Sequence, residues 1–232
     1  VTQAAHSFYW RGTPTTRLEQ LGIHPAPQVL NAIAEPPFVL TPASTICANS
    51  FPETGEWLAD ELQRLTGIKS EISCDDSPSI TVVEAETNHP EGYRIVSRDA
   101  EIKVFANGIR GAFYGVMATA DMIGFDGEAP AADIEDWPAL NTRLFFHEVT
   151  PHSGPMTSPD QVSHFITKVV ARARFNTVVL ELKGGLKSER HPVLSRHDAW
   201  TKSDLEQVLD AARRFGITVI PTFNTPAHSH WI

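Results

Sequence analysis

The chain has 232 residues, of which 41% are hydrophobic and 20% charged, and a net charge of -9. This composition is typical of a globular chain of one or two domains, so it excludes a disordered or fibrous protein. The net negative charge argues against a nucleic-acid partner, which needs clustered Lys and Arg, and the apolar runs all fall short of the roughly 18 residues that cross a bilayer.

Residues 1–21 lack a regular hydrophobic period and are expected to form an N-terminal extension. Residues 22–126 are expected to form a small α+β domain. In it, the apolar spacing over residues 54–66 predicts an amphipathic helix, with Thr54 as its cap and Gly67 at its end.

The rest of this domain shows the patterns of strands and of one more helix. Residues 80–84 are a short β-branched strand, and residues 92–97 and 101–106 form a hairpin. A second helix opens at Asn107 and ends at Gly124. Catalytic residue types do not cluster in this sequence region, so we interpret the domain as structural support.

The two cysteines of the chain, Cys47 and Cys74, leave two alternatives open. They pair as a disulfide in an oxidising compartment, or they remain free buried thiols. The compartment therefore stays open at this stage, with an extracellular or periplasmic location favoured.

Residues 127–138 are acidic and contain Ala and Pro, and we interpret them as a linker. After this segment, residues 139–232 alternate strands with helices. The three expected strands are apolar and cover residues 143–149, 176–182 and 217–223. A helix with a capping box begins at Ser158, and a second capping box is expected at Ser203.

Strand starts 30 to 40 residues apart are typical of successive βα units with parallel strands. The segment thus predicts an α/β fold, the first three strands of an incomplete (β/α)8 TIM-type barrel. Because a closed barrel takes about eight strands and 250 residues, three strands leave edges and apolar surface uncovered. We expect the chain either to associate with itself or to be completed by further chain.

Polar side chains stand at the carboxyl ends of all three expected strands, where barrel enzymes build their sites. Glu148 and Glu181 end otherwise apolar runs, in which an unpaired charge is costly. This favours a functional role, or pairing with Arg143 or Lys183. His228 is a candidate for hydrogen bonding to a substrate, with a structural histidine as the alternative. Flat apolar faces for a sugar ring are available at Trp200, Phe223 and Trp231.

The order of elements, together with several motifs, resembles glycoside hydrolase family 20, the β-N-acetylhexosaminidases, from residue 22 to residue 232. The motifs are Glu91-Gly92-Tyr93-Arg94-Ile95, Gly111-Ala112-Phe113-Tyr114-Gly115-Val116, Asp136-Trp137-Pro138, Phe175-Asn176-Thr177, Gly216-Ile217-Thr218-Val219-Ile220-Pro221 and Pro226-Ala227-His228.

This resemblance implies an enzyme that removes terminal N-acetylhexosamine from a glycan by a retaining, substrate-assisted mechanism without a cofactor. In that mechanism the acetamido oxygen of the sugar attacks, an Asp orients it, and a Glu acts as acid and base. The resemblance places this Asp-Glu pair beyond residue 232, so we assign no catalytic residue to this chain.

The resemblance also implies a substrate-binding set: Arg143, Glu148, Glu181, Asn224 and His228. Arg143 is a candidate clamp on sugar hydroxyls, with an ion pair to Asp136 as its alternative. Glu148 and Asn224 stand where the family has Asp, and Pro151 where it has Arg, which suggests a divergent branch with altered substrate preference.

Three other interpretations remain. The chain is a non-catalytic carbohydrate-binding or scaffold protein with a degraded barrel, or it is another barrel glycosidase such as an α-glucuronidase. A zinc site would have enough donors around His228 and His230, but no metalloenzyme spacing recurs, so we expect no metal.

Overall fold

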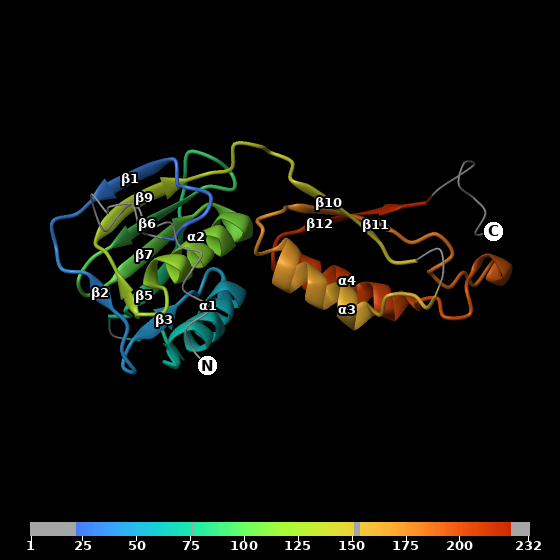
Figure 1. The fold of residues 1–232 in the computed structure, drawn as a ribbon, viewed down its shortest axis with the longest axis horizontal. Coiled ribbons are helices and arrows are strands. Elements are labelled where there is room, and N and C mark those ends of the chain that lie inside the picture. Colours follow the sequence, from blue (N-terminus) through green and yellow to red (C-terminus); the bar gives the residue numbers. More distant parts are fainter. Residues whose placement is uncertain (1–21, 76, 151–153, 224–232) are drawn as a thin grey trace, which may run out of the picture. The chain divides into compact units, whose positions relative to one another are not determined.

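The computed structural model describes residues 22–75, 77–150 and 154–223. The extension expected at residues 1–21 lies outside the described residues. The chain divides into two compact units (Figure 1). Among the described residues, the first unit holds those within 22–87, 93–106 and 115–137, and the second holds those within 88–92, 107–114 and 138–223. Within the described ranges, none of the helices combines the length and apolar character that crossing a membrane requires.

The first unit is built on a mixed seven-stranded sheet in the order β1-β9-β6-β7-β5-β3-β4 (Figure 1). Its strands are β1 (Val29–Ala32), β3 (Thr45–Cys47), β4 (Glu71–Ile72), β5 (Ile80–Glu84), β6 (Tyr93–Ser97), β7 (Ile102–Ala106) and β9 (Ala132–Asp136). The pairs β3-β4, β3-β5 and β5-β7 are parallel, whereas β1-β9, β6-β7 and β6-β9 are antiparallel. A separate antiparallel pair joins β2 (Phe38–Val39) to β8 (Glu128–Ala129).

Alternation along the strands decides which face of this sheet is buried. In register across the sheet, one face carries side chains that are almost fully buried: Ile80, Val82, Ile95, Val104 and Ile134. Helix α1 (Pro52–Thr66) belongs to the same unit as this sheet, and so does the second half of helix α2 (Gly108–Ile123). A Cβ added at Gly115 would lie 2.5 Å from Val104 Cγ1, so α2 approaches β7 closely because this residue has no side chain.

The strand at residues 80–84, the hairpin and both helices of this unit are confirmed. Gly67 ends α1 with a φ of 77°, which glycine adopts without strain. Thr54 as the cap is wrong. The helix begins two residues earlier, at Pro52, and the Thr54 hydroxyl instead donates to the carbonyl of Phe51 at 2.7 Å.

The interpretation of residues 127–138 as a linker is also wrong, because they contain β8 and β9. Strand β9 lies inside the sheet, between β1 and β6. Two of its acidic residues, Asp133 and Glu135, point to the outer face and pair with Arg94 at 2.6 and 3.7 Å, while Ile134 is fully buried. The acidic residues that β9 presents outward gave this segment the composition of a linker, although it is a strand.

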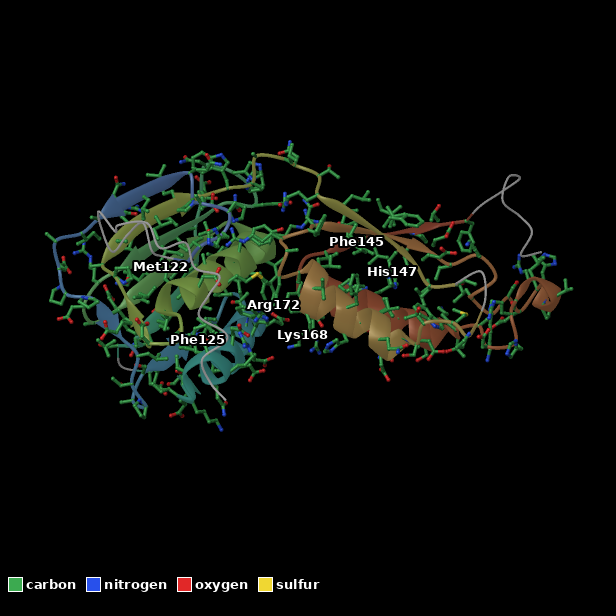
Figure 2. All side chains as sticks on the ribbon, viewed as in Figure 1. Met122, Phe125, Phe145, His147, Lys168 and Arg172 are labelled. Atoms are coloured by element: carbon green, nitrogen blue, oxygen red, sulfur yellow. A yellow bond between two sulfur atoms is a disulfide. The ribbon has the colours of Figure 1, made fainter. Side chains whose placement is uncertain are left out.

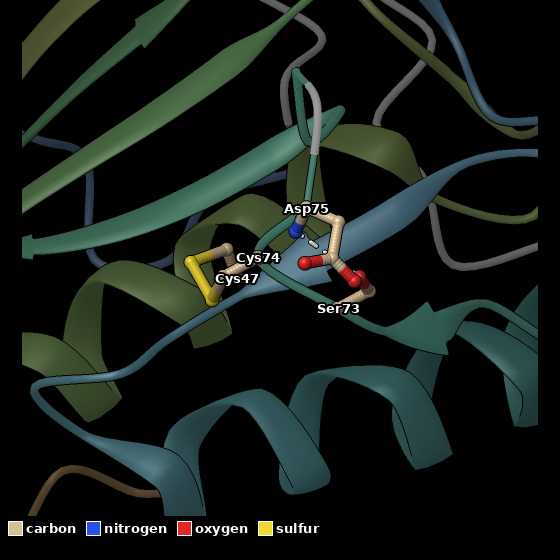
Figure 3. Close-up of a disulfide and its surroundings, with 4 residues drawn as sticks. All are labelled: Cys47, Ser73, Cys74 and Asp75. Atoms are coloured by element: carbon tan, nitrogen blue, oxygen red, sulfur yellow. Dashed lines mark hydrogen bonds between the residues drawn. A yellow bond between two sulfur atoms is a disulfide. The ribbon is translucent and has the colours of Figure 1, made fainter.

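Cys47 and Cys74, whose pairing was left open, form a disulfide that joins β3 to the segment after β4 (Figure 3). Their Cα atoms are 4.7 Å apart. Next to the bridge, Ser73 Oγ contacts Asp75 Oδ2 at 3.0 Å and accepts from the Asp75 backbone N–H at 3.1 Å. The disulfide closes a loop across a sheet edge formed by the two-residue strand β4.

The second unit is built on three parallel strands in the order β10-β11-β12. They are β10 (Leu144–Glu148), β11 (Thr177–Glu181) and β12 (Thr218–Thr222). Helices α3 (Pro159–Phe165), which continues as a π-helical turn (Ile166–Val170), and α4 (Lys202–Arg214) lie on one face of this sheet (Figure 1). A short 3-10 helix (Pro192–Leu194) interrupts the connection between β11 and α4.

One of these two helices, α3, begins at the expected cap, and the other, α4, does not. The capping box at Ser158 is confirmed: its hydroxyl accepts from the Gln161 N–H at 3.2 Å, and the Gln161 side chain accepts from the Ser158 N–H at 3.0 Å. For α4 the capping residue is Thr201, paired with Asp204, so the expected box at Ser203 is wrong by two residues. Thr201 and Ser203 are each followed by an acidic residue three positions later, so the sequence pattern fits both. The course of the backbone decides that Thr201 is the cap.

The strands of the second unit have one face toward the helices and one open face. Phe145 and His147 lie on the helix side, where their rings are 5.2 Å from that of Phe165 in α3 (Figure 2). On the opposite face the apolar residues Leu144, Phe146 and Ile220 remain 45%, 52% and 46% exposed. Parallel strands of a β/α sheet are usually covered on both faces, so this exposure is unusual.

Candidate functional site

The carboxyl ends of β10 and β11 carry the cluster that we consider the candidate site. Glu148 and Glu181 are register partners across these two parallel strands. The Lys183 ammonium forms ion pairs with both carboxylates, with Glu148 Oε1 and with Glu181 Oε2, the latter at 3.3 Å. We call these three residues the rim triad.

The rim triad is buried unevenly. The side chains of Lys183 and Glu181 are only 6% and 8% exposed, whereas that of Glu148 is 31% exposed. Glu148 is therefore the member that solvent or a ligand reaches. The formal charges, two carboxylates and one ammonium, leave a net charge of -1 on the cluster.

The turn that carries Lys183 is tightly held. Lys183 has a φ of +45°, in the left-handed region that non-glycine residues seldom adopt. The carbonyl of Leu182 accepts from the Gly185 N–H at 2.7 Å and from the Thr150 hydroxyl at 2.8 Å. A Cβ at Gly185 would lie 2.6 Å from the Leu182 carbonyl oxygen and 2.6 Å from Thr150 Oγ1, so only glycine fits there.

Two opposing effects act on the pKa of Lys183. Burial lowers this pKa, but the hydrogen bonds to Glu148 and Glu181 outweigh burial and hold it above its ordinary value. Lys183 is therefore a permanent cation at physiological pH, and it offsets part of the repulsion between the two carboxylates.

The loop that follows the turn folds back onto it through backbone hydrogen bonds. The Arg196 N–H donates to the Gly184 carbonyl at 2.9 Å, and the Trp200 N–H donates to the Gly185 carbonyl at 2.8 Å. The Trp200 indole is 3% exposed and donates to the Thr157 carbonyl at 3.0 Å, so it packs in the interior instead of offering a face to a sugar. Asp198 accepts from the Arg196 side chain and from the Met156 N–H at 2.9 Å, and these bonds hold its pKa well below the usual range.

Arg143 lies at the amino end of β10, opposite to the end that carries Glu148. Its side chain donates to the carbonyls of Arg174 and Leu140, both at 2.7 Å, and to the Tyr114 hydroxyl and Glu91 Oε2, both at 2.6 Å. The structure thus does not bring Arg143 together with Glu148 and Glu181. Its ion-pair partner is Glu91, which sequence reasoning did not consider.

Glu91 is the centre of a polar network at the amino ends of the three strands. Besides Arg143, its carboxylate accepts from Arg110 Nη1 at 2.7 Å and from Asn176 Nδ2 at 2.9 Å. Arg110 also donates to the carbonyl of Gly216 at 2.5 Å and to Thr218 Oγ1 at 2.9 Å. Burial raises the pKa of Glu91, but the bonds from Arg143, Asn176 and Arg110 outweigh it and lower that pKa below its ordinary value.

The two ends of the sheet therefore differ in character. The amino end is closed by a saturated network, which in β/α folds is typical of a stabilising role, whereas the carboxyl end carries the partly accessible triad. Asn224, His228 and Trp231 lie outside the described residues. Within residues 22–75, 77–150 and 154–223, no three His, Cys, Asp or Glu side chains gather as they would around a metal ion.

The mixed seven-stranded sheet and the three parallel strands with their helices define an α/β protein, with a candidate site at the carboxyl ends of the parallel strands. The family model described as glycosyl hydrolase family 20, domain 2, matches residues 20–137, which is just over half of the sequence. The chain belongs to glycosyl hydrolase family 20.

Individual relatives agree with this assignment. The chain is 25% identical to a β-N-acetylhexosaminidase of Cellulomonas fimi over 238 residues, covering 91% of this chain and 47% of the relative. The N-acetyl-β-hexosaminidase of Streptomyces plicatus, solved with Thio-NAglucal, has a similar fold with a TM-score of 0.77 at 22% identity, over 91% of this chain and 47% of that one. The chitobiase of Flavobacterium johnsoniae has a TM-score of 0.78 at 19% identity, over 92% and 36%.

The chain spans about half the length of the curated relative that it matches. A mutant of the Streptomyces plicatus enzyme was solved with its product, GlcNAc, and its fold matches this chain with a TM-score of 0.79 at 22% identity. At this level of identity the solved structures establish the fold of the chain.

Proposed function

We propose that this chain is the leading part of a β-N-acetylhexosaminidase that removes terminal N-acetylhexosamine residues from glycans. The observation that carries the proposal is the rim triad: two register-paired carboxylates at the carboxyl ends of parallel strands, in a member of glycosyl hydrolase family 20. The named activity of the Cellulomonas fimi relative supports the same reaction.

The architecture that we propose for residues 139–232 is the first part of a (β/α)8 barrel. The parallel order of β10, β11 and β12, with helices on a single face, supports it. The exposed apolar residues Leu144, Phe146 and Ile220 are also what the inner wall of an unclosed barrel presents. Further strands, or failing those a second copy of the chain, would cover this wall.

The chemistry that we propose is retaining and substrate-assisted, with the acetamido oxygen of the sugar as nucleophile. The Asp that orients it and the Glu that serves as acid and base would come from sequence outside this chain. Glu148 and Glu181 would accept hydrogen bonds from the sugar, and Asn224 and His228 would join them from the end of β12. Arg143 has no place in this site, because its donors are engaged at the other end of the strand.

An extracellular or periplasmic location is part of the proposal. The disulfide between Cys47 and Cys74 supports it, because structural disulfides persist in oxidising compartments and are rare in the cytosol.

The test is to assay the full-length protein on 4-nitrophenyl N-acetyl-β-glucosaminide, with the corresponding β-glucoside as the matched control. We expect release of nitrophenol from the first substrate alone, because the glucoside lacks the acetamido group. A folded protein that cleaves neither substrate, or both equally well, contradicts the proposal. Calorimetric binding of the sugar without turnover would favour the non-catalytic carbohydrate-binding alternative.

A further inference from the structure

Lys183 differs from an ordinary surface lysine in three ways that the structure shows independently. Its ammonium contacts two carboxylates at once, its side chain is 6% exposed, and its backbone lies in the left-handed region at φ +45°. Residues held in such a conformation are strained, and strain of this kind concentrates at functional sites.

The turn itself does not require a lysine. A residue with positive φ is accommodated best by glycine or asparagine, and two glycines already follow at positions 184 and 185. Lysine at this position strains the backbone, but its ammonium then lies between Glu148 and Glu181. We therefore interpret the turn as a means of positioning the Lys183 ammonium.

A lysine that served only to neutralise a buried charge would need a single carboxylate. Here Glu181, 8% exposed, supplies that partner, whereas Glu148 keeps 31% of its side chain exposed and still contacts the same ammonium. Each carboxylate offers about four acceptor sites, so one bond to Lys183 leaves Glu148 with acceptors directed to solvent. The net charge of -1 suits an uncharged ligand that donates hydrogen bonds.

We propose that Lys183 is a positioning residue, which holds Glu148 and Glu181 as an ionised, oriented pair of acceptors for the hydroxyl groups of a pyranose ring. This inference rests on the proposed function. We assign Lys183 no contact with the sugar, because its side chain is 6% exposed and its ammonium already pairs with both carboxylates. Pre-oriented acceptors bind a ligand more tightly, since their side chains are already ordered before the ligand arrives.

The experiment compares three variants in the full-length protein. Lys183→Met removes the ammonium and keeps the length of the side chain. Lys183→Arg keeps the charge but exchanges a compact ammonium for a planar fork. Lys202→Met is the matched control, because Lys202 is 90% exposed and only 3.9 Å from Glu206, its surface partner. For each variant kcat, KM and the pH dependence of kcat/KM are measured on the aryl N-acetylglucosaminide.

We expect Lys183→Met to raise KM about tenfold or more, since hydrogen bonds to charged groups are the strongest of their kind. The acid limb of its kcat/KM profile should also move to higher pH, because two adjacent carboxylates without a cation between them retain a proton more readily. Lys183→Arg should fall between wild type and Lys183→Met, and Lys202→Met should match wild type.

A fourth variant, which carries two substitutions, guards against a folding defect. In Lys183→Met combined with Glu181→Gln, the net charge of the cluster is again -1 and the repulsion is gone, so the acid limb should return toward that of wild type. If Lys183→Met lowers only the folded fraction and leaves both KM and the acid limb unchanged, the inference is overturned while the proposed function stands. If wild type neither cleaves nor binds the sugar, the proposed function is overturned, and the inference with it.

Discussion

Replacing Glu91 by glutamine tests whether the amino end of the β10-β11-β12 sheet is a stabilising network or part of a sugar site. Glu91 accepts from two guanidinium groups and one amide, and its side chain is 9% exposed. Glutamine has the same shape and keeps one acceptor oxygen, but it has no charge, and its NH2 donor faces either Arg143 at the Oε2 position or Arg110 and Asn176 at the Oε1 position. The change therefore leaves two arginines without their carboxylate.

The expected cost follows from these contacts. A hydrogen bond to a charged group contributes roughly 1.5–3 kcal/mol, and breaking a buried ion pair on one side costs about 3–5 kcal/mol. Since Arg110 is 30% exposed and water compensates part of its loss, we expect the free energy of unfolding to fall by about 3 kcal/mol. For a chain of this size that lowers Tm by roughly 6–12 °C.

The assay is urea denaturation together with calorimetric Tm, and Asp210→Asn is the control. Asp210 pairs with Arg213 on the surface of the same unit, where its side chain is 63% exposed, so its loss should change stability little. A Glu91→Gln protein as stable as this control would refute the reasoning.

The pH dependence gives a second check. Because the pKa of Glu91 is lowered by folding, its contribution is complete above the ordinary value of 4.5 and is lost as pH falls through the folded value. Glu91→Gln should therefore flatten the acid side of the stability curve.

Three further predictions concern other parts of the chain. Burial lowers the pKa of His147, so its imidazole binds a proton less readily in the folded protein than in the unfolded chain. The free energy of unfolding should therefore fall as pH drops below 6.5. His147→Phe should remove this pH dependence from denaturation curves. Cys47→Ser opens a loop of 27 residues and should cost about 3.5 kcal/mol; a wild-type Tm that is indifferent to reductant would contradict this. Gly185→Ala should cost about 1–3 kcal/mol and raise KM, because the new methyl group meets the Leu182 carbonyl; unchanged KM would separate the turn from the site.

Local patterns were enough to predict most helices and the longer strands. The strand at residues 80–84, the hairpin after it and the strands at 143–149, 176–182 and 217–223 stand out as short runs of apolar or β-branched residues. The strands missed were β1 to β4, β8 and β9. Most of them have two to four residues, too few for a period to emerge, and β9 was concealed by its acidic outward face.

For the candidate site, the position at strand ends identified Glu148 and Glu181. A charge that ends an apolar run needs a partner, and the sequence named Arg143 and Lys183 as the two options without deciding between them. One available signal was overlooked: Arg143 precedes its strand, so it belongs to the end of the sheet opposite to Glu148. The part of Glu91 in the network had no signal, since its partners are 19, 52 and 85 residues away.

The sequence by itself determined the family, most of the helices and longer strands, and the acidic residues at the strand ends. Each of these can be recognised from residues that are neighbours along the chain. The tertiary structure alone decided that β9 joins the sheet, that Lys183 holds both carboxylates and that Arg143 turns to Glu91. These are choices among partners far apart in sequence, and they depend on which side chains the packing of strands and helices brings within hydrogen-bonding distance.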